Sequence, residues 1–156
     1  MIANNLKCAE AKMLIRKPAA SVFEAFVDPS ITKHFWFTKS SGRLDHNTKV
    51  IWEWEMYHVS STVTVKEIIP NEKISFDWNQ PARTVEFKFT SLGDNSTYVT
   101  VREFGYDKTG DELLEIIKDS TGGFTTVLDG LKAFLEHNIN LNLIADKFPV
   151  GVGATG

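Results

Sequence analysis

An alternation of bulky apolar and charged residues in Val50–Met56 limits the possible folds of this chain more than any other feature of its sequence. Successive side chains of a strand point to opposite faces, so Trp52 and Trp54 would share one face while glutamates occupy the other. The same alternation, again with aromatic residues on one side, returns in Lys73–Trp78 and Arg83–Ser91. Strands of this kind predict one wide apolar sheet face, which a second layer must cover.

Several further stretches after Gly42 carry strand signals, and the segments between them are short and rich in turn residues. Short links join antiparallel neighbours, whereas parallel strands need long crossover connections. The sequence therefore predicts a first strand within Ala11–Arg16 and, later, an antiparallel meander. The predicted strands of the meander are Arg43–Leu44, Thr48–Tyr57, Ser61–Ile69, Lys73–Trp78, Arg83–Ser91 and Thr97–Phe104.

Two short helices are predicted between the first strand and this meander. Pro18 suits the first turn of a helix, and apolar residues up to Val27 recur at helical spacing. Asp28 then suits the N-cap of a second short helix, with Pro29 at its first position.

The longest helical signal follows the meander. Thr109 and Glu112 have the spacing of a capping box and predict a helix that ends near Thr121–Gly123. A longer helix is then expected over Phe124–Leu135, where the apolar residues form one stripe. Beyond Glu136 both a strand and a helix fit the pattern, and we favour a helical extension.

This long helix is the predicted element that can cover the apolar sheet face, which gives an α+β fold with a curved sheet wrapped around the helix. Gly130 inside the helix costs about 1 kcal/mol relative to alanine, and a close approach to the sheet or to a ligand would be one reason for it. A ligand pocket would lie in any gap that side chains leave between sheet and helix.

The composition limits the class of protein. At 156 residues the chain fits one domain, predicted over residues 1–150 with a flexible tail at 151–156. A hydrophobic share of 42% and a net charge of −3 are ordinary for a soluble protein and provide no basic surface for nucleic acid. No apolar run is long enough to span a membrane, Cys8 is the only cysteine, and the N-terminus lacks a signal-peptide pattern, so we expect a cytoplasmic protein.

A family resemblance is carried by the order and spacing of Ile15–Phe26, Phe35–Phe37, Val65–Ile74 and Gly123–Leu131. These segments resemble the START-like superfamily, also called SRPBCC, and within it the group named after homologues of the activator of heat-shock protein 90 ATPase. The resemblance implies the helix-grip fold with a cavity between the sheet and the C-terminal helix. The family often has Trp-Trp-Gly-Pro where this chain has Trp36–Lys39, so a ligand known for a relative would transfer poorly.

The residues predicted to line this cavity are the inward aromatic residues of the strands and the apolar stripe of the long helix. The alternative is that the same side chains only fill the core against the helix, because aromatic residues bury large areas without any ligand. The predicted cavity residues are Phe35, Trp36, Trp52, Trp54, Val65, Phe76, Trp78, Phe87, Phe89, Val101, Glu103, Phe124, Val127, Leu128 and Leu131.

Glu103 is the charged member of this set. It shares parity with Val99 and Val101, so it is expected to point toward the cavity, where a carboxylate could anchor a ligand or serve as a general acid or base. The alternative is that the strand twists or ends there and that Glu103 reaches solvent.

The sequence offers no metal site, no cofactor motif and no catalytic constellation. The histidines lack metal-ligand spacing, although His34 beside Phe35 and Trp36 could lie at a pocket mouth. No glycine-rich phosphate loop or nucleophile elbow is present. We therefore predict no cofactor and no catalytic residue.

The leading functional hypothesis is a protein, more plausibly not an enzyme, that binds a small apolar or aromatic ligand in the cavity between sheet and helix. One alternative, implied only by the resemblance, is a co-chaperone-like module that acts on a heat-shock protein 90-type ATPase. Another is a cyclase- or hydrolase-like enzyme with Glu103 as its acid or base. A chaperone partner or a weak homodimer is compatible with the sequence, whereas nucleic-acid binding and membrane insertion are not expected.

Overall fold

A seven-stranded antiparallel sheet and one long helix dominate the structure, a computed structural model that describes residues 7–151. The tail predicted at 151–156 lies outside the described residues except for Gly151. The elements are β1 (Ala9–Ile15), α1 (Ala19–Val27), α2 (Pro29–Thr32), β2 (Lys39–Ser40), β3 (Lys49–Trp54), the 3₁₀ turn η2 (Glu55–Tyr57), β4 (Val59–Ile69), β5 (Lys73–Trp78), β6 (Arg83–Ser91), β7 (Thr97–Phe104), α3 (Gly110–His137) and α4 (Leu143–Lys147).

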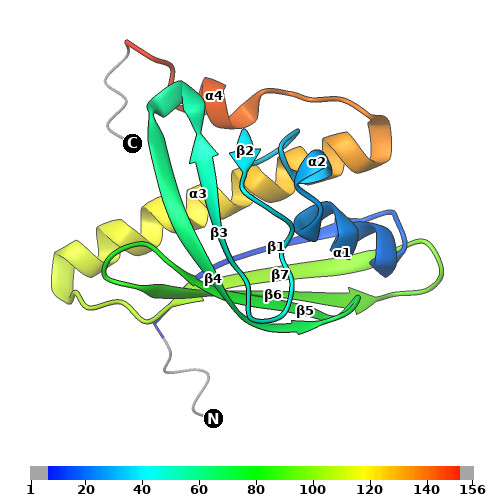
Figure 1. The fold of residues 1–156 in the computed structure, drawn as a ribbon, viewed down its shortest axis with the longest axis horizontal. Helices are drawn as coiled ribbons and strands as arrows, with labels where there is room; N and C mark the ends of the chain where they lie inside the picture. The colour runs from blue at the N-terminus through cyan, green and yellow to red at the C-terminus, as the bar shows by residue number, and fades with distance from the viewer. Residues whose placement is uncertain (1–6, 152–156) are drawn as a thin grey trace.

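The strands are arranged in the order β1-β7-β6-β5-β4-β3-β2, and every neighbouring pair is antiparallel. The meander of the sequence is thus confirmed, and β1 joins it by pairing with β7, from Ala9 opposite Glu103 to Ile15 opposite Thr97. β3 and β4 curl upward at one end, so the sheet wraps around α3 (Figure 1). The α+β fold and the two short helices after β1 are as predicted.

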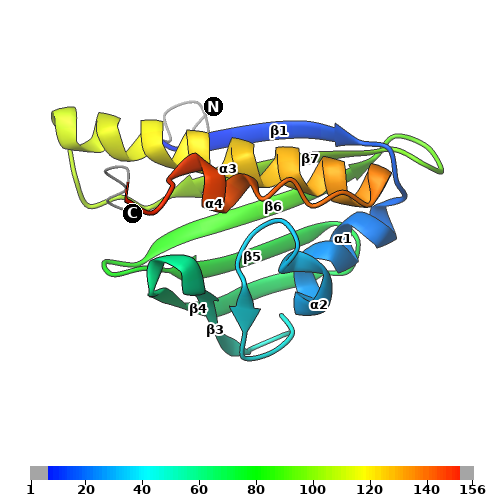
Figure 2. The ribbon, with the colours of Figure 1, turned by 90° about the horizontal axis from the view of Figure 1, so that it is seen from above.

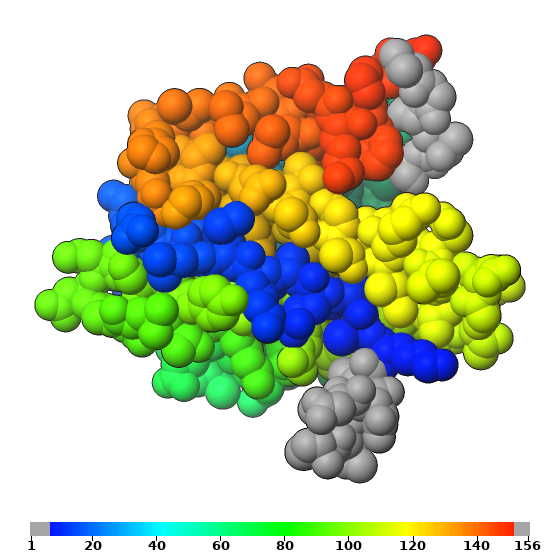
Figure 3. All heavy atoms as spheres, turned by 180° about the vertical axis from the view of Figure 1, so that it is seen from behind, coloured from blue at the N-terminus to red at the C-terminus, as the bar shows by residue number. Residues whose placement is uncertain are grey.

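The helices cover the concave face of the sheet from two sides. Seen from above, α3 runs along β1 and β7, whereas α1 and α2 lie beside the C-terminal end of α3, on the side of β5 (Figure 2). Phe26 of α1 packs on Phe87 of β6, with their ring centroids 4.5 Å apart. From behind, α3 and β1 lie against each other along the surface (Figure 3). The contact between sheet and helix is therefore closed along β1.

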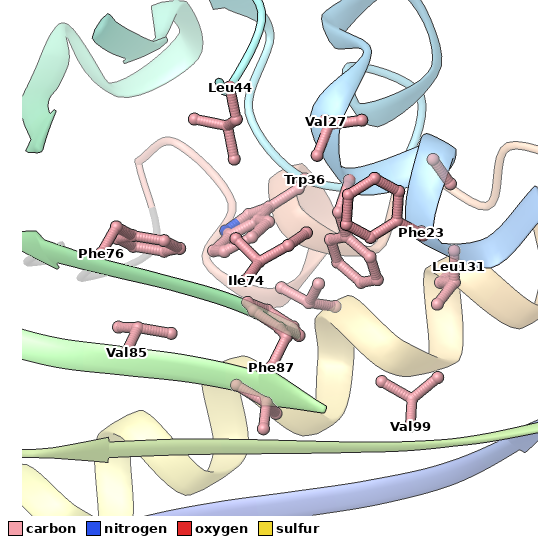
Figure 4. Close-up of a cluster of buried hydrophobic side chains, with 14 of the residues drawn as sticks. Phe23, Val27, Trp36, Leu44, Ile74, Phe76, Val85, Phe87, Val99 and Leu131 are labelled. Carbon is pink, nitrogen blue, oxygen red and sulfur yellow. The ribbon is translucent and has the colours of Figure 1, made fainter. Parts of the chain in front are cut away.

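The space between these layers is filled by one aromatic core. Trp36, from the segment after α2, points into it and lies among Ile74, Phe76 and Phe87 of the sheet (Figure 4). Its indole contacts Trp52 on β3 at a centroid distance of 4.9 Å. The loop between α2 and β2 thus supplies a central core residue, which a strand or helix pattern does not predict.

The long helix is continuous where we predicted a break. α3 spans Gly110–His137 without interruption, so the predicted end near Thr121–Gly123 is wrong. Gly122 and Gly123 each cost about 1 kcal/mol of helix stability relative to alanine. The packing of Phe124 and of the buried residues after it outweighs this cost. The Thr125 and Thr126 hydroxyls also donate to the carbonyls four residues earlier, at 2.7 and 2.9 Å.

Both ends of α3 differ in detail from the prediction. Thr109 occupies the N-cap position, but its side chain makes no capping hydrogen bond. The predicted helical extension beyond Glu136 is confirmed only in part, because Asn138 ends α3 in the left-handed conformation (φ 55°) and residues 139–142 are not helical. A separate short helix, α4, then begins at Leu143.

The first strands of the meander also differ from the prediction. Arg43–Leu44 is not a strand; the short strand β2 lies earlier, at Lys39–Ser40, and pairs with β3. β3 ends at Trp54 and passes into a 3₁₀ turn, so Met56 does not continue the alternation. At α2 the prediction holds, since the Asp28 carboxylate accepts a hydrogen bond from the Ser30 N–H at 2.9 Å. None of the helices in residues 7–151 has the length and hydropathy to cross a membrane.

Candidate functional site

The centre of the cavity that the sequence predicted is occupied by side chains. Trp52 and Phe76 are 1% exposed, and their ring centroids lie 5.3 Å apart. Phe37 packs on the same indole at 4.7 Å, and Trp36 lies on it at 4.9 Å. These distances are those of aromatic rings in mutual contact. For most of the inward aromatic face, the core-filling alternative therefore describes the packing.

A pocket remains where α3 passes the far end of β5, and we call it the Trp78 pocket. Its volume is about 180 Å³, and its walls are mainly apolar. Trp78 faces Phe124 of α3 with ring centroids 6.0 Å apart and faces Trp36 at 5.9 Å. Its lining residues are Trp36, Trp78, Ser120, Gly123, Phe124, Val127 and Ile144.

Each wall of this pocket follows from a local structural feature. Trp78 is the last residue of β5, so its indole stands at the rim of the sheet. Phe124 and Val127 belong to the buried stripe of α3. Trp36 is held by the turn after α2, where its N–H donates to the Thr32 carbonyl at 3.0 Å. At Gly123 an added Cβ would meet nothing within 4 Å, so the missing side chain leaves part of the space open.

The segment after α3 forms a cover over the pocket. Ile144 of α4 contributes its side chain to the wall. The Tyr57 hydroxyl, from the tip of the β3–β4 hairpin, lies 2.7 Å from the Ile144 carbonyl and 2.9 Å from that of Phe148. On the other side, Lys147 Nζ donates to Thr126 Oγ1 of α3 at 3.1 Å. α4 is thus tied both to the hairpin and to the long helix.

A smaller pocket of about 100 Å³ lies beside the Trp78 pocket. Trp36 and Ile144 line both, so these two side chains separate them. His34, which the sequence suggested for a pocket mouth, lines the smaller one and stacks on Phe134 with ring centroids 4.6 Å apart. α3 passes close to Phe35 at Gly130, because a Cβ at Gly130 would lie 3.1 Å from Phe35 Cβ.

Glu103 lies behind the Trp78 pocket and does not line it. Its side chain is 1% exposed, so the alternative in which it reaches solvent is wrong. Trp78 Nε1 donates to its Oε2 at 2.8 Å, and the Tyr106 hydroxyl and Arg83 Nη1 lie 3.2 and 3.5 Å from its Oε1. Burial and the neighbouring Glu103 carboxylate raise the pKa of the Tyr106 hydroxyl, which therefore stays protonated.

The structure brings together only part of the predicted cavity set. Trp36, Trp78, Phe124 and Val127 meet at the Trp78 pocket, and Phe35 reaches the smaller one. The others lie in the core or, like Trp54, are partly buried beside it. These remaining members are Trp52, Trp54, Val65, Phe76, Phe87, Phe89, Val101, Glu103, Leu128 and Leu131.

Sequence reasoning missed Ser120, Gly123 and Ile144 as lining residues. A helical reading of α3 without a break would have placed Ser120 and Gly123 on the face of Phe124 and Val127, at spacings of three and four residues. Ile144 lies in a segment whose apolar spacing fits both a strand and a helix, so the sequence did not determine which way its side chain points. In the described residues, no three His, Cys, Asp or Glu side chains gather as a metal site would require.

Comparisons with known proteins agree on a family. The sequence model of the family described as Activator of Hsp90 ATPase homolog 1-like protein matches residues 16–136. A search of the curated proteins finds no match.

Solved structures show the same fold. A Staphylococcus saprophyticus protein is 29% identical, with a TM-score of 0.76, over 86% of this chain and 95% of its own. The Aha1 dimer from Colwellia psychrerythraea is 15% identical, with a TM-score of 0.72, over 83% and 96%. An HSP90 activator from Plasmodium falciparum is 18% identical, with a TM-score of 0.65, over 83% and 96%.

Proposed function

This chain belongs to the family of Activator of Hsp90 ATPase homolog 1-like proteins, and we propose that it binds a small, flat, apolar or aromatic ligand in the Trp78 pocket. The observation that carries the proposal is an open pocket with tryptophan and phenylalanine walls in an otherwise filled core. Aromatic walls favour planar ligands through stacking and edge-to-face contacts.

The volume of the pocket limits the size of the ligand. Pockets for drug-sized ligands span roughly 300–1,000 Å³, whereas a cavity of about 150 Å³ holds benzene. At about 180 Å³, the Trp78 pocket suits a ligand of one or two rings. Sterols and three-ring flavonoid-like aromatics, which a larger helix-grip cavity would admit, exceed this space.

Binding without turnover fits the chemistry of the walls. The lining residues carry no titratable side chain, and their polar side-chain groups are the Ser120 hydroxyl and the indole N–H groups of Trp36 and Trp78. General acid–base catalysis needs a titratable group within hydrogen-bond reach of the substrate. Glu103, the candidate for an enzyme, is engaged by Trp78, Tyr106 and Arg83 behind the wall. A cyclase- or hydrolase-like activity is therefore the weaker proposal.

The test is a titration with a size series, benzyl alcohol, indole and 1-naphthol, followed by the backbone and indole resonances in ¹H–¹⁵N spectra. The blocking variant is Gly123→Leu, because a Cβ at this position meets nothing within 4 Å and a longer side chain would extend into the pocket. The matched control is Gly123→Ala, which gains the same backbone preference for helix without filling the space.

We expect saturable shifts around the Trp78 pocket in the wild type and in Gly123→Ala, and none in Gly123→Leu. A sterol or a flavonoid should give no shift there. The proposal fails if no member of the series binds the wild type, or if Gly123→Leu binds as well as Gly123→Ala.

The second candidate is the co-chaperone function, and the observation that favours it is the family match. The protein would then bind a heat-shock protein 90-type ATPase and raise its turnover. The assay is ATP hydrolysis by the chaperone of the same organism, with and without this protein. An unchanged rate together with no co-sedimentation would remove this candidate, and neither result bears on the ligand titration.

A further inference from the structure

The Glu103 carboxylate is a buried acceptor whose two oxygens serve different neighbours. Oε2 accepts from Trp78 Nε1 at 2.8 Å. Oε1 lies 3.2 Å from the Tyr106 hydroxyl and 3.5 Å from Arg83 Nη1. The bond to the indole is the shortest of the three. A buried carboxylate requires such donors, because an unpaired one is costly to remove from water.

Strand register brings these residues together. Trp78 on β5 lies directly opposite Arg83 on β6, and Val85 on β6 lies opposite Glu103 on β7. Since Arg83 and Val85 are two positions apart, all of these side chains share the concave face. The placement of Trp78, Arg83 and Glu103 is thus built by the sheet, whereas Tyr106 comes from the segment after β7. The Trp78 indole in this cluster forms one wall of the Trp78 pocket.

We propose that Glu103 is a positioning residue that holds the Trp78 indole in the wall of the pocket and thereby sets the affinity for a planar ligand. The part concerning affinity rests on the proposed function; the part concerning the indole does not. Trp78 is partly exposed and stands at the end of its strand, whereas Trp52 is buried, so one side of the Trp78 ring faces solvent instead of packed side chains. The bond to Oε2 adds a directional restraint on the ring, which packing against other aromatic rings does not provide.

The informative variant is Glu103→Gln, which keeps the size of the side chain but has one acceptor oxygen and one amide donor. The oxygen is expected to turn toward the Arg83 guanidinium, because hydrogen bonds from a charged donor are the stronger ones. The amide nitrogen would then face Trp78 Nε1, and two donors would oppose each other. The substitution thus removes the indole bond selectively.

The control is Tyr106→Phe, which acts on the same cluster but leaves the indole bond in place. The Tyr106 hydroxyl contacts the Glu103 carbonyl at 2.8 Å and accepts from the Ala9 N–H at 3.2 Å. Its loss should loosen the pairing of β1 and β7 without freeing Trp78. A purely structural role of the cluster would make the two variants behave alike.

The first measurement is made on the protein without ligand. In ¹H–¹⁵N spectra, Glu103→Gln should shift the Trp78 indole N–H and speed its exchange with solvent by roughly tenfold. Tyr106→Phe should not. Trp52 Nε1, buried and without a hydrogen-bond partner in the described part of the chain, is the internal reference for exchange, and its exchange rate should not change. Its chemical shift does not serve as a reference, because the Trp52 ring centroid lies 6.2 Å from that of Trp78. An unchanged Trp78 signal in Glu103→Gln overturns the proposal, even if the wild type binds ligands.

The second measurement is the affinity for indole in a double-mutant cycle. Glu103→Gln should weaken binding by roughly fivefold in the wild-type background and cause no further loss in Trp78→Phe, which has no N–H to hold. Equal losses in both backgrounds, or an equal loss in Tyr106→Phe, overturn the positioning role. If the wild type binds no probe at all, the proposed function fails, and the Trp78 signal alone decides whether Glu103 holds the indole.

Discussion

Two glycines on α3 should respond in opposite directions to the same substitution. Gly123 and Gly130 both lie inside the helix, so alanine at either position gains about 0.8–1.0 kcal/mol of helix propensity. What differs is the space that the new methyl group enters. At Gly123 nothing lies within 4 Å of the position that a Cβ would take, whereas at Gly130 a Cβ would lie 3.1 Å from Phe35 Cβ and 3.4 Å from the Phe35 carbonyl oxygen.

The expected magnitudes follow from these distances. Gly123→Ala should stabilise the protein by about 0.5–1 kcal/mol, because the propensity gain meets no opposing contact. At Gly130 the helix and the segment around Phe35 must move apart by a few tenths of an ångström. Overpacking of a filled core costs about 1–3 kcal/mol, which cancels or exceeds the gain. Gly130→Ala should therefore be less stable than Gly123→Ala by about 1–3 kcal/mol.

Equilibrium urea unfolding followed by tryptophan fluorescence measures both variants against the wild type. The slope of the transition should stay constant, so that the midpoint reports stability alone. A change at Gly130 should also shift the backbone resonances of Phe35 and its neighbours, whereas a change at Gly123 should not. If Gly130→Ala is stabilised as much as Gly123→Ala, the close contact between α3 and Phe35 does not limit the packing, and the reasoning is refuted.

Two further predictions concern contacts that join distant parts of the chain. Tyr57→Phe removes the hydroxyl that lies 2.7 Å from the Ile144 carbonyl. The Asp146 N–H of α4 should then exchange with solvent roughly fivefold faster, while the midpoint of urea unfolding changes little. An unchanged exchange rate would show that the hydroxyl does not hold α4. Burial opposes the ionisation of Glu136, but hydrogen bonds from Lys132 and Arg16 hold its pKa below the usual value. A lowered folded-state pKa stabilises the protein at pH values above the unfolded pKa of about 4.3, and this stabilisation is lost as the pH falls through the folded-state pKa. The wild type should therefore be more stable to unfolding than Glu136→Gln by about 1 kcal/mol at pH 7, and this difference should disappear on acidification below about pH 4.3. A difference that persists to low pH would contradict this.

The sheet could be predicted from the sequence because its signal is local and repeated. Alternation in Lys73–Trp78 and Arg83–Ser91 reports which side chains face inward, and the structure places those strands within the predicted bounds. The break predicted at Thr121–Gly123 failed because the sequence does not reveal the tertiary contacts that compensate for a helical glycine. Whether a glycine is tolerated inside the helix depends on neighbours that lie far away in the sequence, such as Phe35 for Gly130.

The pocket could be predicted only in part, for a related reason. Periodicity identifies Phe124 and Val127 as inward-facing, but it does not show that Trp36 enters the core from an irregular segment and forms a wall of the pocket. Nor does it place Ile144, whose position depends on the turn at Asn138 and on the contact with Tyr57. The inward direction of Glu103 followed from strand parity, whereas its bond to Trp78 depended on the register of three strands.

The position of β1 has a consequence for the order in which the chain folds. β1 has one partner in the sheet, β7, which lies more than eighty residues later in the sequence, and its other main contact is with α3. The strands β3 to β7 are joined by short turns and can pair as soon as each is synthesised. On a ribosome, β1 therefore waits unpaired until β7, which ends at Phe104, has been translated. We expect the pairing of β1 with β7 to form late and the meander to form early.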